Sequence, residues 1–261
     1  MTGVTGPGAA ATDGSMRIDV ALVPAEARRW TAGVCIVVDE LRASSTVVTL
    51  LDRGCTAVLP AASLAEARRL GRAHGALTAG ERNVVRVPGF DLGNSPTEIA
   101  REDVVGRTVA LSTRNGTAVI RALPEDTEVL IGCLLNATAC ARTALARARA
   151  DGGVIGIVCA GRLGGFALDD AVAAGCLVER LIACAGPQGA ALELSDGAKA
   201  ARRIWHTSSD VVAALRDSTS GQMVVRYGPE EDVAFCARVD VSETVPVLMR
   251  TEPQRIERSM A

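Results

Sequence analysis

The sequence predicts an α/β protein in which helices cover both faces of a largely parallel sheet. Short apolar runs typical of buried strands alternate along the chain with longer segments typical of helices. Polar loops follow the strand-like runs, and Ser, Thr, Asn or Asp then opens the next helix. With 261 residues, 48% of them hydrophobic, the chain has ample material for a core.

Each predicted element has a local reason. Uninterrupted aliphatic and β-branched runs predict strands at residues 17–22, 34–38, 57–59, 109–112, 128–131 and 154–159. A further strand-like pair occupies residues 223–226 and 233–237. Segments that begin at or just after a capping residue predict helices at residues 44–53, 63–73, 116–123, 137–150 and 169–185. Two further helical segments are expected at residues 198–207 and 209–216.

The two ends of the chain carry weak structural signals. Residues 1–15 are mostly Gly, Ala and Thr, without the basic and apolar regions of a signal peptide, and they predict a disordered tail. Residues 251–261 are expected to form a C-terminal tail. No apolar run approaches membrane-spanning length, so we expect a cytoplasmic protein with no membrane partner.

The composition argues against several classes of function. The net charge of −2 provides no basic field for nucleic acid. Aromatic residues make up only 2% of the chain, so few side chains could stack on the bases of a single strand. The eight cysteines form no CxxC pair and show no zinc-binding spacing. They are expected to be small buried side chains in a reducing compartment.

Four loops repeat the same pattern of strand, polar loop and capped helix. They cover residues 39–46, 112–117, 134–138 and 159–170. Because the carboxyl ends of parallel strands share one edge of a sheet, these loops can converge on one crevice. Ordinary helix capping explains any single loop equally well, but four such loops containing Arg and Asp favour a ligand site.

The first of these loops holds the strongest candidates. Asp39 follows a buried strand and could bind Mg²⁺ or act as a nucleophile toward phosphorus. Arg42 could clamp phosphate oxygens with its planar guanidinium. Ser44, Ser45 and Thr46 open the next helix, where free N–H groups suit an anion. The alternative is a structural Asp39–Arg42 pair at a helix start.

Other segments carry further candidates, each with a structural alternative. Glu81-Arg82 fits a loop that faces a ligand, or a solvated surface pair. In the 89–96 loop, Asn94 and Ser95 can donate to an anion, although Ser95-Pro96 could equally start a helix.

Two more pairs follow in the later loops. Asn115-Gly116 could offer its amide and N–H groups to a phosphate. Asp169-Asp170 exceeds what capping requires, and the repulsion between its charges indicates a metal ligand in at least one of them.

These segments, in this order, closely resemble the 2-phosphosulfolactate phosphatase family. The most specific match is Gly89-Phe90-Asp91-Leu92-Gly93-Asn94-Ser95-Pro96, and the resemblance spans residues 17–248. It implies a three-layer α/β/α fold with two similarly built halves, expected at residues 16–135 and 136–250, and an active site between them. It also implies Mg²⁺-dependent hydrolysis of 2-phospho-3-sulfolactate to 3-sulfolactate and phosphate, a reaction on the way to coenzyme M.

The residue types and the resemblance together suggest a role for each candidate. We expect Asp39, Arg42 and Asp170 to be catalytic and Asp39, Glu81 and Asp170 to supply the Mg²⁺ ligands. The expected phosphate-binding residues are Ser44, Ser45, Thr46, Asn94, Ser95, Asn115 and Gly116. Arg82, Arg114 and Arg162 are expected to bind the rest of the substrate.

The sequence departs from the family pattern in two ways. Glu40 stands where the family usually has an apolar residue, and Arg114 and Arg162 are additional charges. The two arginines could recognise a sulfonate or carboxylate, or indicate a different substrate.

Three questions stay open at this point. The attacking group is water by default, with Asp39 as the alternative. A phosphatase for another metabolite and a non-catalytic anion-binding protein of the same fold are the rival functions. A homodimer is the default expectation for the oligomeric state.

Overall fold

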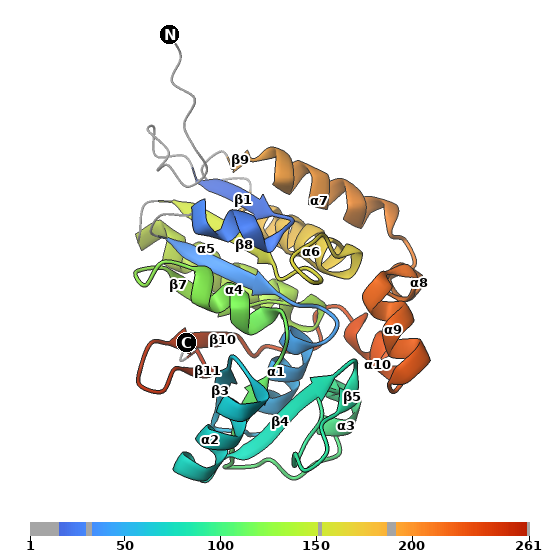
Figure 1. Cartoon of the computed structure of the whole chain (residues 1–261). Helices are drawn as coiled ribbons and strands as arrows, with labels where there is room; N and C mark the ends of the chain where they lie inside the picture. The colour runs from blue at the N-terminus through green and yellow to red at the C-terminus, as the bar shows by residue number, and fades with distance from the viewer. Residues whose placement is uncertain (1–15, 30–32, 151–152, 187–191, 260–261) are drawn as a thin grey trace.

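One mixed sheet runs through the computed structural model, which describes residues 16–29, 33–150, 153–186 and 192–259. Over these residues the strand order is β5-β4-β6-β3-β11-β10-β7-β2-β8-β1-β9 (Figure 1). The strands are β1 (Arg17–Ala21), β2 (Val34–Val38), β3 (Ala57–Ala61), β4 (Leu77–Arg82), β5 (Val85–Arg86), β6 (Thr108–Ser112), β7 (Glu128–Ile131), β8 (Val154–Cys159), β9 (Glu193–Leu194), β10 (Pro246–Met249) and β11 (Arg255–Arg258).

The sheet consists of two parallel blocks with an antiparallel hairpin between them. Strands β7, β2, β8, β1 and β9 form one block, and β3, β6 and β4 form the other. The hairpin β10–β11 joins the blocks, since Val247 pairs with Leu130 of β7 and Ile256 pairs with Val58 of β3. The carboxyl ends of β2 and β6, one from each block, thus face a common region.

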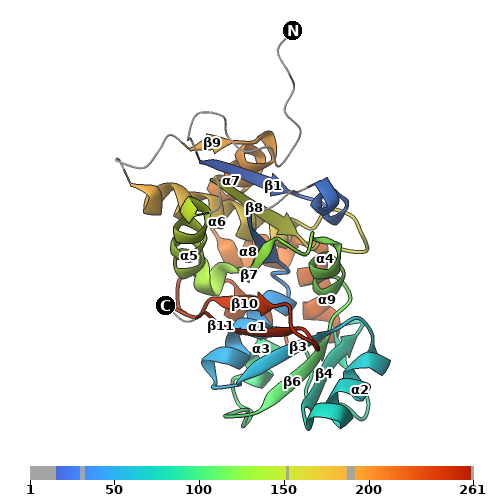
Figure 2. The ribbon, with the colours of Figure 1, turned by 90° about the vertical axis from the view of Figure 1, so that its left-hand side faces the viewer.

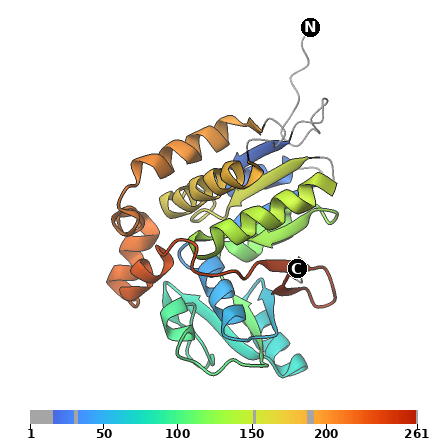
Figure 3. The ribbon, with the colours of Figure 1, turned by 180° about the vertical axis from the view of Figure 1, so that it is seen from behind.

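Helices cover both faces of the sheet. The α-helices are α1 (Ala43–Asp52), α2 (Leu64–His74), α3 (Pro96–Ile99), α4 (Gly116–Ala122), α5 (Ala137–Ala150), α6 (Leu168–Ala185), α7 (Asp196–Thr207), α8 (Val211–Asp217), α9 (Thr219–Tyr227) and α10 (Glu231–Cys236). Two short 3₁₀ helices are η1 (Pro24–Arg29) and η2 (Leu134–Asn136). Figure 2 shows α5 and α6 on one side of the strands and α4 on the other, and Figure 3 shows α5, α6 and α7 from behind.

The alternation of side chains along β2 explains these layers. Ile36 and its neighbours at even positions pack with α5 and α6, whereas Cys35 and Val37 pack with α1 and α4. Because both faces of β2 are buried, all five of its residues are apolar and the sequence shows no alternation with polar residues. The predicted three-layer α/β architecture is confirmed.

The predicted strands at residues 223–226 and 233–237 are wrong. Residues 223–226 belong to α9 and residues 233–236 to α10, and α9 is capped by Ser218, whose hydroxyl accepts a hydrogen bond from the Gly221 N–H. The β-branched pair Val224-Val225 gave the strand signal, but only Val224 is buried. Helical periodicity, with one buried face, therefore governs this segment.

The C-terminal region also differs from expectation. The expected tail at residues 251–261 contributes β11 to the interior of the sheet, where Ile256 is buried. The sequence analysis also missed β4, β5, β9 and β10. Strands β1 and β2, from the expected N-terminal half, pair with β8, which lies in the expected C-terminal half. The division into halves at residues 16–135 and 136–250 stays a prediction. The expected tail at residues 1–15 lies outside the described residues.

Two further expectations can be compared with the structure. All eight cysteines are free and seven are buried, which confirms the interpretation of them as small core side chains. None of the described helices combines the length and the hydropathy that a membrane crossing requires.

Candidate functional site

An open pocket lies where the strand-end loops of the two blocks meet. It collects residues from the loops after β2, β6 and β8, from the β4–β5 hairpin, from the 89–96 loop and from α9. The lining residues are Leu41, Arg42, Glu81, Asn83, Val84, Asn94, Arg114, Asn115, Arg162, Leu163, Ser220, Met223 and Val224. Three arginines and a single carboxylate give this pocket an excess of positive charge.

Three buried acids fasten the strand-end loops together. The Asp39 carboxylate accepts a hydrogen bond from the Gly116 N–H, which connects the loop after β2 to the loop after β6. Glu40 accepts one from the Leu134 N–H after β7, and Asp170 accepts one from the Gly161 N–H after β8. Acids at the end of β2 and the start of α6 thus connect all four loops, and three of the loops reach the pocket, while residues 134–138 do not line it.

Asp39 lies at the end of β2 and is only 8% exposed. Its Oδ2 accepts from the Gly116 N–H at 3.0 Å, and its Oδ1 accepts weakly from the Ala43 N–H at 3.4 Å. Burial raises the pKa of Asp39 to about 6, and the negative charges of Asp169 and Glu81 add to that increase. The Asp39 carboxyl thus sits at the starts of both α1 and α4.

Asp170 has a similar connecting role. Its Oδ1 accepts from the Glu40 N–H at 2.8 Å, and its Oδ2 accepts from the Gly161 N–H, also at 2.8 Å. Burial raises the pKa of Asp170 well above its ordinary value, and repulsion from Asp169 and Asp39 adds to the effect. Each Asp170 oxygen therefore already serves a backbone N–H.

The sequence does not distinguish Asp169 from Asp170, but in the structure the two carboxylates have different hydrogen-bond partners. It is buried, and its Oδ1 has no hydrogen-bond partner among the described residues. Burial raises the pKa of the Asp169 carboxyl. An unpaired buried carboxylate oxygen is costly unless a ligand satisfies it. Asp169 is thus the acid of this pair with the freer oxygen.

The donor set is compatible with a divalent cation. No group of three His, Cys, Asp or Glu side chains in the described ranges forms a complete metal cage. Mg²⁺ usually needs only one or two carboxylates, with waters and substrate phosphate completing its octahedron. Asp169 has an unpaired Oδ1, and its charge is close enough to repel that of Asp39. These two carboxylates are therefore enough to hold one Mg²⁺ ion.

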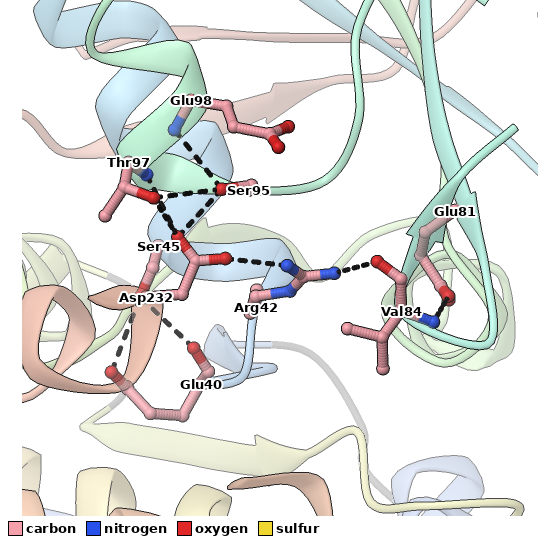
Figure 4. A network of polar contacts seen from close by, with 9 residues as sticks. All are labelled: Glu40, Arg42, Ser45, Glu81, Val84, Ser95, Thr97, Glu98 and Asp232. Atoms are coloured by element: carbon pink, nitrogen blue, oxygen red, sulfur yellow. Dashed lines mark hydrogen bonds and ion pairs between the residues drawn. The ribbon is translucent and has the colours of Figure 1, made fainter. Parts of the chain in front are cut away.

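Arg42 is almost fully buried, at 3% exposed, and it lines the pocket. Its Nη1 donates to Asp232 Oδ2 at 2.6 Å, and its Nη2 donates to the Val84 carbonyl at 2.7 Å (Figure 4). The structure therefore pairs Arg42 with Asp232 rather than with Asp39. A guanidinium has five N–H donors, so three are left for a ligand.

Other predicted residues fall into two groups. Asn94, Arg114, Asn115, Arg162 and Glu81 reach the pocket as expected. Asn94 is buried, and its amide oxygen has no partner in the described part of the chain, so this oxygen can accept a hydrogen bond from a ligand.

The second group lies away from the pocket lining. Ser44, Ser45 and Thr46 are buried in the first turn of α1. The Ser44 hydroxyl accepts from the Asp39 N–H, and the Ser45 hydroxyl donates to Glu40. The phosphate-binding roles of these three side chains stay predictions.

Three more residues belong with this second group. The Ser95 hydroxyl donates to Asp232, and the Gly116 N–H is used by Asp39. Arg82 is exposed on the hairpin, outside the pocket lining. The substrate-binding role of Arg82 and the phosphate-binding roles of Ser95 and Gly116 also stay predictions.

The sequence analysis missed Asp232 as a site residue. It lies in the first turn of α10 and is completely buried. The only sequence signal was its place in the run Asp232-Val233-Ala234-Phe235-Cys236-Ala237, which the strand assignment obscured.

Comparison with known proteins gives a consistent result. Residues 21–251 match the family model described as 2-phosphosulpholactate phosphatase. The chain is similar to the probable 2-phosphosulfolactate phosphatase of Deinococcus radiodurans, at 38% identity over 90% of this chain and 94% of that protein. Proteins with the same description from Thermotoga petrophila and Thermus thermophilus are 36% and 37% identical, each over 89% of this chain and over 95% and 94% of their own lengths.

Proposed function

The chain belongs to the 2-phosphosulfolactate phosphatase family, and on this premise we propose that it hydrolyses 2-phospho-3-sulfolactate to 3-sulfolactate and phosphate. Membership of that family makes the chain a phosphoric monoester hydrolase. The observation that carries the proposed substrate is the presence of Arg42, Arg114 and Arg162 in one pocket. The substrate has three anionic groups, namely a phosphate, a carboxylate and a sulfonate. A role on the way to coenzyme M and a cytoplasmic location are parts of the same proposal.

The three arginines differ in their surroundings, and this difference assigns their roles. Arg42 is buried and held by two protein acceptors, which suits the fixed geometry that a reacting phosphate requires. Asn94 and Asn115 line the pocket with it and can donate from their amides. Arg114 and Arg162 come from the loops after β6 and β8 and would bind the carboxylate and the sulfonate.

We propose that the reaction depends on Mg²⁺ and that Asp39 and Asp169 hold the ion, with Glu81 at the edge of the pocket. Bound there, Mg²⁺ would neutralise phosphate charge and favour ionisation of a water. Asp170, which the sequence favoured as a ligand, would act by fixing the loops that carry Glu40 and Gly161.

Water is the proposed attacking group. Asp39 is proposed above as a ligand of the ion, and a carboxylate that holds Mg²⁺ is not free to attack phosphorus.

A phosphate-release assay tests this proposal. The wild-type protein is assayed on 2-phosphosulfolactate, on phospholactate, which lacks the sulfonate, and on 2-phosphoglycerate, each with Mg²⁺ and with a chelator. We expect turnover only with Mg²⁺ and a preference for the sulfonate. Mg²⁺-dependent turnover that favours another ester would change the substrate assignment. Absence of turnover on every ester, together with tight anion binding, would support the non-catalytic alternative.

A further inference from the structure

We propose that Asp232 is a positioning residue that holds Arg42 and the 94–97 segment in one fixed arrangement for phosphate binding. Nothing in the sequence or the comparisons assigns this residue a role. The proposal rests on the phosphatase function proposed above, and it adds a residue from α10, an element that contributes nothing to the pocket lining itself.

The two oxygens of Asp232 face two different parts of the site. Oδ2 accepts from Arg42 Nη1 at 2.6 Å. Oδ1 accepts from the Ser95 hydroxyl at 2.8 Å, from the Thr97 hydroxyl at 2.6 Å and from the Thr97 N–H at 3.1 Å (Figure 4). A single carboxylate therefore accepts four hydrogen bonds and joins Arg42 to the start of α3.

Burial makes it costly to separate Asp232 from Arg42. The side chain of Asp232 is 0% exposed and that of Arg42 is 3% exposed. A buried ion pair that loses one partner leaves an uncompensated charge, so neither side chain can swing away at low cost. The Arg42 guanidinium is therefore held in place by its two acceptors, Asp232 and the Val84 carbonyl.

The second anchor of Arg42 leads back to the pocket. The Val84 carbonyl accepts from Arg42 Nη2, and the Val84 N–H donates to Glu81 Oε2 at 2.5 Å (Figure 4). Arg42 is thus fixed between α10 on one side and the β4–β5 hairpin on the other. Its remaining N–H donors are available to a phosphate in the pocket.

The 94–97 segment is held in the same way. The Ser95 hydroxyl that donates to Asp232 also accepts the Glu98 N–H at 3.2 Å and caps α3. Asn94, the preceding residue, lines the pocket. Asp232 itself is not part of the pocket lining, so it acts through Arg42 and this segment rather than on the substrate.

The first test is Asp232→Asn within a double-mutant cycle. The retained Oδ1 can still accept the three donors from Ser95 and Thr97, while the new NH₂ group faces Arg42 Nη1, a donor. We expect kcat/KM to fall about 100-fold, the size of effect that a misplaced binding group produces. In an Arg42→Gln background the same substitution should cause no further loss. Additive losses in the cycle would overturn the proposal, because independent sites add.

A second pair of variants covers the case in which Asp232→Asn does not fold. Thr97→Val removes one donor to Asp232 and leaves the Arg42 pair intact. Thr49→Val is its matched control, since the buried Thr49 hydroxyl donates to the Ser45 carbonyl at 2.7 Å without contacting Asp232. We expect a several-fold lower kcat/KM for Thr97→Val only, with both variants similarly destabilised in thermal unfolding. Equal kcat/KM values for these two variants would contradict the proposal.

Binding of inorganic phosphate, measured by calorimetry, separates this proposal from the proposed function. A wild-type protein that binds phosphate but hydrolyses no ester would refute the phosphatase assignment. The role of Asp232 would then be tested by measuring the phosphate Kd of the same set of variants. Non-additive effects of Asp232→Asn and Arg42→Gln on that Kd would support the positioning role. An active wild-type enzyme with additive variants would refute the role of Asp232 alone. Failure of the wild type to bind phosphate in any assay would refute both.

Discussion

The carboxylate of Asp39 accepts a hydrogen bond from the backbone N–H of Gly116 at 3.0 Å, across 77 residues of sequence. This contact connects the carboxyl end of β2 in one parallel block with the start of α4, which follows β6 in the other block. A Cβ at position 116 would lie 3.2 Å from Asp39 Oδ2, so glycine permits the approach. The pocket therefore lies over a junction between the two blocks.

Arg42→Ala should greatly reduce catalysis, because Arg42 is proposed to bind the phosphate. Loss of the clamp should lower kcat/KM by about 100- to 1,000-fold, equivalent to about 3–4 kcal/mol of transition-state stabilisation. Steady-state kinetics on the preferred ester would measure the effect. Arg203→Ala, at an exposed position of α7, is the control and should be unchanged. Near-normal turnover in Arg42→Ala would exclude the clamp.

Mg²⁺ should stabilise the protein in a pH-dependent way. The pKa of Asp39 is raised from 3.8 to about 6, so between these values the native state binds more protons than the unfolded state. The free energy of unfolding contributed by Asp39 is therefore complete below pH 3.8 and is lost as the pH rises through about 6. A bound cation compensates the charged form, so Mg²⁺ should raise Tm more at about pH 7.5 than at about pH 5.

The control for this measurement is Asp169→Asn, which converts the unpaired carboxylate into a neutral amide. We expect the Mg²⁺-dependent increase in Tm to be largely lost in this variant, in thermal unfolding at matched ionic strength. A Tm increase equal at both pH values, or one retained in Asp169→Asn, would argue against the proposed ligands.

Arg114→Ala and Arg162→Ala should affect substrates according to their charge. Each should raise KM for 2-phosphosulfolactate by about tenfold or more, because a charge-assisted contact contributes about 1.5–3 kcal/mol. For phospholactate, which lacks the sulfonate, one of the two variants should have a much smaller effect. Equal effects of both variants on both esters would show that neither arginine reads the sulfonate.

The loop after β8 should tolerate alanine at one glycine and not at another. Gly161 has φ +65°, and a Cβ there would lie 2.1 Å from the Gly165 carbonyl oxygen. Gly164 has φ +81° with nothing within 4 Å. Gly164→Ala should cost about 1 kcal/mol through backbone strain alone, and Gly161→Ala should cost more. Chemical unfolding compares the two, and equal costs would contradict the close approach.

The β10–β11 hairpin should be essential to stability. Ile256, on β11, is 3% exposed and packs within the core cluster that includes Val58. Ile256→Ala should reduce the free energy of unfolding by about 2–5 kcal/mol. The control is Met249→Ala on β10, where the side chain is 43% exposed and the change should stay within about 0.5 kcal/mol. A small effect at Ile256 would indicate that residues 251–261 behave as the tail that the sequence suggested.

The sequence by itself determined the elements whose signals are local. Strand β2 is apolar at every position because both of its faces are buried, and Ser63 caps the start of α2 because its hydroxyl accepts the Glu66 N–H. The position of Asp39 at a strand end also follows from local order, as does the meeting of four loops at one edge. These features depend on neighbouring residues and on the geometry of parallel sheets, so composition and spacing predict them.

Only the tertiary structure decided the features that depend on distant partners. The short segments at 246–249 and 255–258 become strands because β7 and β3 leave edges for them to pair with. The segment at 233–237 becomes helical while Asp232, beside it, pairs with Arg42 across 190 residues. The choice between Asp169 and Asp170 follows from which oxygens the backbone already occupies. Burial and hydrogen-bond partners are set by the packed chain, and a linear pattern does not encode them locally.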